Sequence, residues 1–238
     1  VNDGAVNVTG SGYLQGISVV SPYGLAEVVN NGTVDVYSDS IAIGVYAGGA
    51  GGASVTNYGS VDAYGLDGGA GLVAYGYQSG VTIDNQGAVY AGSKYGIALG
   101  IVGLGDDANI NNDGYVGAFS FYGDAIGIQA YGAVGGANVT NGGTARATSI
   151  YGNATGILAY AQGTASVAND GAVIAQSYFG QATGIEAFGD SAYVSNYGNV
   201  LAYGYYGDAT GISASGYSVA GVVNNGLVVA ETEYGQSV

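Results

Sequence analysis

The stretch NDGAVIAQSYFGQATGIEAFG (169–189) decides the fold, because the chain repeats it closely a short distance later. Its counterpart is NYGNVLAYGYYGDATGISASG (196–216), in which small, turn-forming and β-branched residues keep their places. Triplets of the form Asn-x-Gly recur every 27 to 29 residues. They begin at Asn2, Asn30, Asn57, Asn85, Asn112, Asn141, Asn169, Asn196 and Asn224. We therefore predict one repeat domain, residues 1–238, of about eight and a half units of about 28 residues.

Each unit alternates apolar and variable residues with a period of two, which is the pattern of half-buried strands. Counted from the Asn as position 0, position +4 is nearly always Val, position +6 is mostly Ala, and position −2 is Val or Ile. A Gly-apolar pair follows later in the unit, as in Gly156-Ile157. This pattern predicts three short strands per unit. The corners are expected at Asn-x-Gly and at a later Tyr-Gly, where glycine would supply a positive φ.

A unit of this size buries too little apolar surface to fold alone, so it must stack on its neighbours. The predicted fold class is all-β: a parallel β-solenoid with three short strands per coil and a right-handed wind. A closed antiparallel outer-membrane barrel is the rival fold, although the tyrosines follow the repeat and do not form two girdles. No run of about 18 apolar residues exists, so we expect no membrane-spanning helix.

The composition restricts the possible functions. Seventeen acidic residues against only Lys94 and Arg146 give a net charge of −15, which disfavours nucleic acid and anionic lipid as partners. The chain has no His and no Cys, so a catalytic site has little chemistry available, and we expect no enzyme activity and no cofactor. It also lacks Met and shows no leader, which suggests a processed chain or an internal piece of a longer one.

The Asn column is the most regular polar feature. Its parity matches that of the buried Val positions, so its side chains are expected either to stack inside the coil as an amide ladder or to cap their own turn. Both interpretations are structural. The expected ladder consists of Asn30, Asn57, Asn85, Asn112, Asn141, Asn169, Asn196 and Asn224.

An aromatic column stands at position +10, and a Gly follows each ring. Its members are Tyr95, Tyr122, Tyr151, Phe179, Tyr206 and Tyr234. A second row at +19 includes Tyr131, Tyr160 and Phe188. Rings at strand spacing stabilise a solenoid by stacking. The functional alternative is an exposed row on which sugars lie or against which a neighbouring rod packs.

Metal and ice binding receive weaker support. Position +12 mixes Asp124 and Asp208 with amides, and a calcium site needs several converging oxygen ligands, so turns are expected and no metal site. A threonine column at +14 suggests an ice-binding face, but no paired Thr row accompanies it. It comprises Thr155, Thr183 and Thr210.

The unit that carries a family resemblance is TGIEAFGDSAYVSNYGNVLA (183–202). It resembles the passenger repeats of bacterial autotransporter and haemagglutinin-like adhesins, and the resemblance extends over the whole chain. The resemblance implies a secreted or surface-displayed β-solenoid that serves as a stalk, adhesin or matrix fibre. The expected location is therefore extracellular or at the cell surface.

The ends of the repeat array carry no polar cap, which isolated solenoids need to prevent edge-to-edge joining. Such ends can dock head to tail, and a contact of this kind propagates into a filament. We therefore expect a structural rod whose main partner is a second copy of itself. The alternative is an adhesin whose Tyr rows engage glycans or host surfaces.

Overall fold

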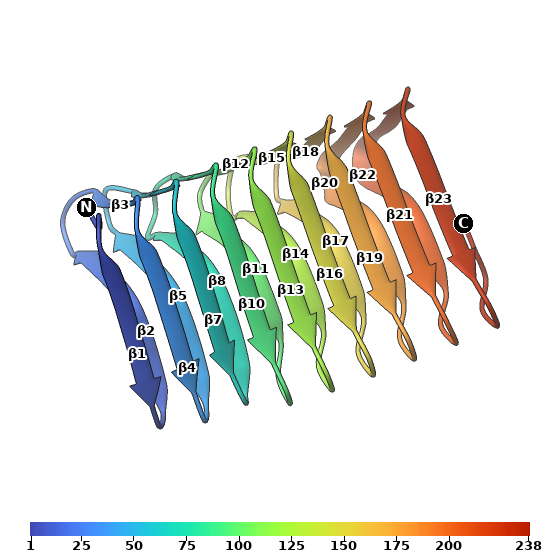
Figure 1. Ribbon diagram of the computed structural model, residues 1–238. Coiled ribbons are helices and arrows are strands. Elements are labelled where there is room, and N and C mark those ends of the chain that lie inside the picture. The colour runs from blue at the N-terminus through green and yellow to red at the C-terminus, as the bar shows by residue number, and fades with distance from the viewer.

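The computed structural model describes all 238 residues as a rod of stacked coils (Figure 1). Twenty-three strands and no helix follow one another along a single axis, and the N- and C-termini lie at opposite ends of the rod. All strand pairs are parallel, and each coil contributes three strands. The prediction of a parallel β-solenoid is confirmed.

The strands that follow the Asn-x-Gly corners form a nine-stranded sheet along the front of Figure 1. They are β1 (Ala5–Gly10), β4 (Thr33–Ser38), β7 (Ser60–Gly65), β10 (Ala88–Ser93), β13 (Tyr115–Ser120), β16 (Thr144–Ser149), β19 (Ala172–Ser177), β21 (Asn199–Gly204) and β23 (Leu227–Thr232). We call this the front sheet.

The other two strands of each coil belong to a second sheet, because β20 (Ala182–Asn196) and β22 (Ala209–Asn224) each run through both of its sides. Its first side contains β2 (Tyr13–Ser21), β5 (Ile41–Gly49), β8 (Gly68–Gly76), β11 (Ala98–Gly105), β14 (Ala125–Gly132) and β17 (Ala154–Ala161). Its second side contains β3 (Ala26–Asn30), β6 (Ala53–Asn57), β9 (Val81–Asn85), β12 (Ala108–Asn112), β15 (Ala137–Asn141) and β18 (Thr164–Asn169).

Equal repeat positions lie directly over one another in both sheets. In the front sheet Val89 pairs with Val61 on one side and with Val116 on the other, and all three are fully buried. The same register stacks Ile128 on Ile157 in the second sheet. Columns of identical side chains therefore fill a narrow interior, in which each coil buries the apolar surface of its neighbours. The handedness of the wind stays a prediction.

The expectation that corner glycines adopt a positive φ is wrong. Only Gly12 and Gly52 among the glycines do so. The corner glycines are required for a different reason, which is the close approach of the preceding coil. A Cβ on Gly114 would overlap the carbonyl oxygen of Gly87, and the same overlap recurs at the other Asn-x-Gly corners. The coils lie one strand spacing apart even at their corners, which leaves no room for a side chain there.

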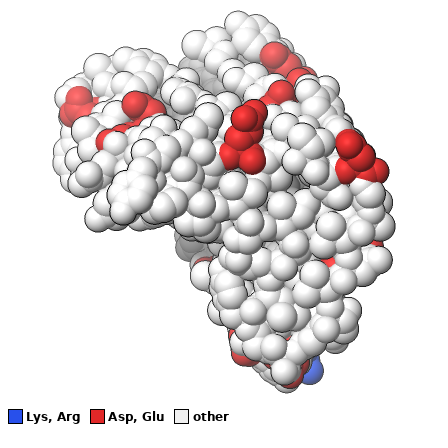
Figure 2. Space-filling view, turned by 90° about the vertical axis from the view of Figure 1, so that its left-hand side faces the viewer, with Lys and Arg blue, Asp and Glu red and all other residues white.

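Viewed from its N-terminal end, the rod has a bent outline, not a round one (Figure 2). Acidic side chains are scattered over several sides of this view. On this face the acidic charge is therefore spread out and not gathered in one patch.

Candidate functional sites

The Asn column forms an unbroken amide ladder inside the rod. Each Asn donates from Nδ2 to Oδ1 of the Asn in the next coil, from Asn2 through to Asn224, with N–O distances of 2.7 to 2.8 Å. The seven members from Asn30 to Asn196 are completely buried. The same Nδ2 also donates to the carbonyl oxygen two residues later, at 3.2 to 3.3 Å. The column thus stacks and caps its own turn at once.

The ladder has a direction. Every donor points toward the C-terminal end of the rod, so the Nδ2 of Asn224 makes no hydrogen bond, and the Oδ1 of Asn2 accepts only a 3.3 Å bond from the Gly4 N–H. The C-terminal end of the rod therefore presents a free donor, and the N-terminal end presents an acceptor with capacity to spare.

A second polar ladder was not identified from the sequence. Buried Ser120 donates from Oγ to the carbonyl of Gly96 in the preceding coil at 2.8 Å, and it accepts from the Gly123 N–H of its own coil at 3.0 Å. The same pair of bonds recurs at Ser149, Ser177 and Thr232. The restriction of position +8 to Gly, Ser or Thr was the available signal.

The aromatic row at +10 lies at the corner between the front sheet and the second sheet. Its six rings, Tyr95 to Tyr234, stack with centroids 4.8 to 5.7 Å apart and planes within 7° to 15° of one another. The rings are 45% to 65% exposed. Phe121, Tyr178 and Tyr205 pack edge-on against them. Since the neighbours in the row cover the ring faces, the row presents mainly edges and hydroxyls to solvent.

The row at +19 is shorter. Tyr131, Tyr160 and Phe188 stack at 5.2 Å, with planes 2° and 12° apart. The first three coils carry Gly12, Ser40 and Asp67 where the +10 row would continue. Neither row therefore runs the length of the rod.

The +12 residues bind backbone and not one another. Asp124 accepts from the N–H of Asn153 in the next coil at 2.7 Å, and Asp208 does the same for Gln236 at 2.8 Å. No group of three or more acidic residues is placed to hold a metal ion. These side chains close the corner between coils.

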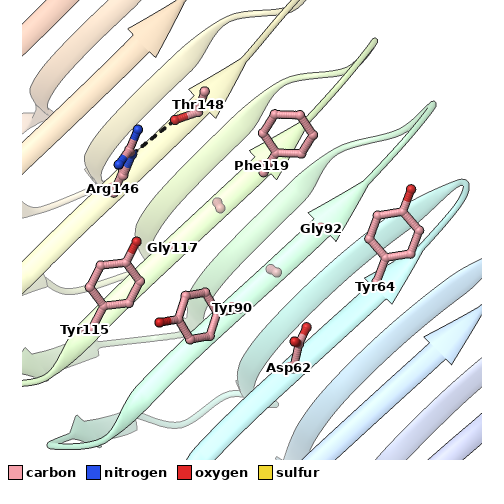
Figure 3. Close-up of a pocket in the computed structure, with 11 residues that line it drawn as sticks. Asp62, Tyr64, Tyr90, Gly92, Tyr115, Gly117, Phe119, Arg146 and Thr148 are labelled. Atoms are coloured by element: carbon pink, nitrogen blue, oxygen red, sulfur yellow. Dashed lines mark hydrogen bonds between the residues drawn. The ribbon is translucent and has the colours of Figure 1, made fainter.

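A cleft that sequence reasoning missed lies on the front sheet, across β7, β10, β13 and β16 (Figure 3). Its volume is about 480 Å³. Two outward columns define it. One contains Asp62, Tyr90, Gly117 and Arg146, and the other contains Tyr64, Gly92, Phe119 and Thr148. Each column has one glycine, Gly117 in the first and Gly92 in the second, and these two residues form the floor of the cleft.

The two ends of the cleft carry opposite charges. Arg146 hydrogen bonds only to neutral oxygens, to Thr148 Oγ1 at 3.4 Å and Gln176 Oε1 at 2.7 Å. At the other end, burial and the neighbouring carboxylate of Asp35 raise the pKa of Asp62. The sequence signals for this site were a glycine in each of two outward columns that carry a larger side chain in every other coil, and the single arginine of the chain, Arg146.

Comparison with protein-family models, curated proteins and solved structures finds no match for this chain. The fold therefore defines the class, a parallel β-solenoid repeat protein, and the function must be argued from the geometry. No helix in the structure could cross a membrane.

Proposed function

We propose that this protein is a structural rod that stacks end to end into an extracellular filament. The observation that carries the proposal is the polarity of the amide ladder, which leaves Asn224 Nδ2 free at one end and Asn2 Oδ1 accessible at the other. A second copy placed on the C-terminal end would continue the ladder with the same donor and acceptor.

The apolar columns support the same contact. Val228 in β23 and Val6 in β1 occupy the inward column whose other members are buried, and both are only partly buried in the first and last coils of the structure. The outer backbone edges of β23 and β1 likewise have no strand partner. Docking β1 of one copy on β23 of another would bury the valines and pair the edges of the front sheet. The second sheet, which has eight strands on each of its sides, would be interrupted by one layer at the junction.

This register determines the length of the repeat along the filament. The front sheet contributes nine strands per copy, so each copy would add nine layers, or about 43 Å at about 4.8 Å per layer. A register that overlapped or skipped a layer would change this length by about 5 Å. The axial repeat therefore tests the proposed junction directly.

The acidic surface of the solenoid would keep assembled filaments from associating side by side. Acidic residues lie on several sides of the rod and give each copy a charge of −15, which repels filaments from one another laterally. The buried polar side chains of the coils are the Asn and Ser residues of the ladders.

The test is electron cryomicroscopy of the purified chain beside two variants. Val228→Lys places a charge at the proposed junction, whereas Val134→Lys places the same charge on the side of the rod, where Val134 is 67% exposed. We expect filaments with a repeat of about 43 Å for the wild type and Val134→Lys, and single rods for Val228→Lys. Filaments of Val228→Lys, single wild-type rods at all salt concentrations, or a different repeat would refute the proposal.

A further inference from the structure

Arg146 has no carboxylate partner within its own chain. It is the only basic residue on the front-sheet strands, and it hydrogen bonds only to the neutral oxygens of Thr148 and Gln176. In its own outward column Asp62 stands three layers away, about 14 Å, and Asp35 stands one layer further. The front sheet therefore carries a cation and a pair of carboxylates that are too far apart to neutralise each other.

The floor of the cleft between these charges is covered by aromatic rings of the chain itself. Tyr64 lies over Gly92, where an added Cβ would be 2.5 Å from Tyr64 Cδ2. Tyr115 lies over Gly117, where an added Cβ would be 3.0 Å from Tyr115 Cε1. The two glycines thus let the rings lie against the sheet. This surface suits a flat partner and not an inserted ring.

Two further rings of this surface face solvent. Tyr90 is 45% exposed and Phe119 is 43% exposed, and both lie between Asp62 and Arg146 (Figure 3). Exposed aromatic side chains bounded by charged groups are typical of a protein interface. A flat partner of matching shape is another β-sheet, because two sheets pack face to face about 10 Å apart.

The charges are placed so that a second copy of the same face complements them. A two-fold axis parallel to the strands and midway between β10 and β13 reverses the order of the coils but keeps each position along the strand. It sets β7 against β16 of the second copy, and β10 against β13. Asp62 of each copy then faces Arg146 of the other, because the two residues share one column and are equally far from the axis. The contact contains two equivalent ion pairs.

This orientation also keeps the acidic residues of the two front sheets apart. Only three front-sheet strands carry an acidic residue, namely Asp35, Asp62 and Glu231. The axis places β4, with Asp35, against β19, which has no charged residue, and it leaves β23 beyond β1 of the second copy. Acidic rods repel each other in other orientations, whereas in this one the facing charges attract.

We propose that the front sheet from β7 to β16 binds the same face of a second copy, so that two rods with opposite axial directions are joined by two Asp62–Arg146 ion pairs around a centre of tyrosine and phenylalanine rings. The four strands offer a face of about 20 Å by about 19 Å, which is small for a stable interface, so we expect a dissociation constant in the micromolar range. The contact does not involve the ends of the rod. It therefore goes beyond the proposed filament and holds whether or not the rods join end to end.

The test is sedimentation equilibrium of single rods, with Val228→Lys as the parent because its charge lies at the end of the rod. We expect a reversible dimer at low ionic strength that dissociates as salt is added. Arg146→Asp should weaken the dimer by about tenfold or more, because each ion pair becomes a repulsion between carboxylates. Lys94→Asp changes the net charge equally at a corner outside the front-sheet strands, and it should leave the dimer unchanged.

Reversing both charges completes the test. Asp62→Arg alone should dissociate the dimer as Arg146→Asp does, whereas the double variant restores opposite charges at both contacts and should dimerise like the parent. All these variants should keep the far-UV circular dichroism of the parent, since both side chains are exposed. Parent rods that stay monomeric at low ionic strength, an equal effect of Lys94→Asp and Arg146→Asp, or a folded double variant that does not dimerise would overturn the assignment.

Discussion

Replacing Asn112 by Ala tests how strongly the amide ladder holds the coils together. Asn112 is completely buried in the middle of the rod. It accepts from Asn85 Nδ2 at 2.7 Å, donates to Asn141 Oδ1 at 2.7 Å, and donates to the Gly114 carbonyl at 3.3 Å. Alanine removes both ladder bonds and the cap in a single step.

The expected loss of stability comes mainly from the amide groups of Asn85 and Asn141, which lose a hydrogen-bond partner. The Oδ1 of Asn141 loses its ladder donor, and one N–H of Asn85 loses its ladder acceptor, in an interior that no water reaches. Each such orphan costs about 1–3 kcal/mol. The cavity left by the amide adds to this, so we expect the free energy of unfolding to fall by about 3–5 kcal/mol.

The matched control is Asn2→Ala at the end of the same ladder. Asn2 is only half-buried and makes one ladder bond, to Asn30, so its loss should cost about 1 kcal/mol. Guanidinium unfolding followed by far-UV circular dichroism compares the two variants. Hydrogen exchange should show that the damage at Asn112 is centred on the coils beside it, because each coil contacts only its neighbours.

A third variant, Asn112→Asp, distinguishes hydrogen bonding from simple packing. The aspartate has the same shape, but its carboxylate faces the Oδ1 of Asn141, and burial raises its pKa. A raised pKa in the folded state means that stability is present at low pH and is lost as pH rises through that pKa. We expect Asn112→Asp to unfold at lower denaturant at pH 7 than at pH 4, relative to wild type. Equal costs for Asn112→Ala and Asn2→Ala, together with a pH-independent Asn112→Asp, would refute the reasoning.

Three further predictions concern the glycines, the rings and the cleft. Gly156→Ala should lower the free energy of unfolding by about 2–3 kcal/mol, because its Cβ would overlap the core Val173 and the carbonyl oxygen of Gly184 in the next coil. In the control Gly80→Ala the new Cβ meets nothing nearer than 3.6 Å, so this variant should be nearly neutral in the same guanidinium unfolding experiment. Tyr160→Ala should cost about 1–3 kcal/mol, because it removes two stacked contacts at 5.2 Å; a loss no larger than that of an exposed, unstacked tyrosine such as Tyr23 would contradict this. Burial and the nearby carboxylate raise the pKa of Asp62, so its ionisation destabilises the fold as pH rises; Asp62→Asn should raise the unfolding midpoint at pH 7 but not at pH 3.

The fold could be predicted from the sequence because the same short pattern, marked by the Asn-x-Gly triplet, occurs nine times. The inward columns of Val, Ile and Ala, together with the period-two alternation, were sufficient to place three strands in every coil. The role of the corner glycines could not be predicted in the same way. Local turn chemistry suggests a positive φ at Gly114, whereas the true constraint is the carbonyl of Gly87 in another coil, a contact that exists only after stacking.

The cleft escaped sequence analysis for the opposite reason, because it lies where the repeat fails. A regular column presents the same side chain in every layer, so its members cover one another and leave nothing to bind. Only a departure such as Gly92 opens a space with walls, and only a unique residue such as Arg146 gives that space a charge of its own. In a solenoid the inward positions are committed to stacking. Departures confined to outward columns can therefore add a binding site without loss of stability, and those positions are where further sites on such rods should be sought.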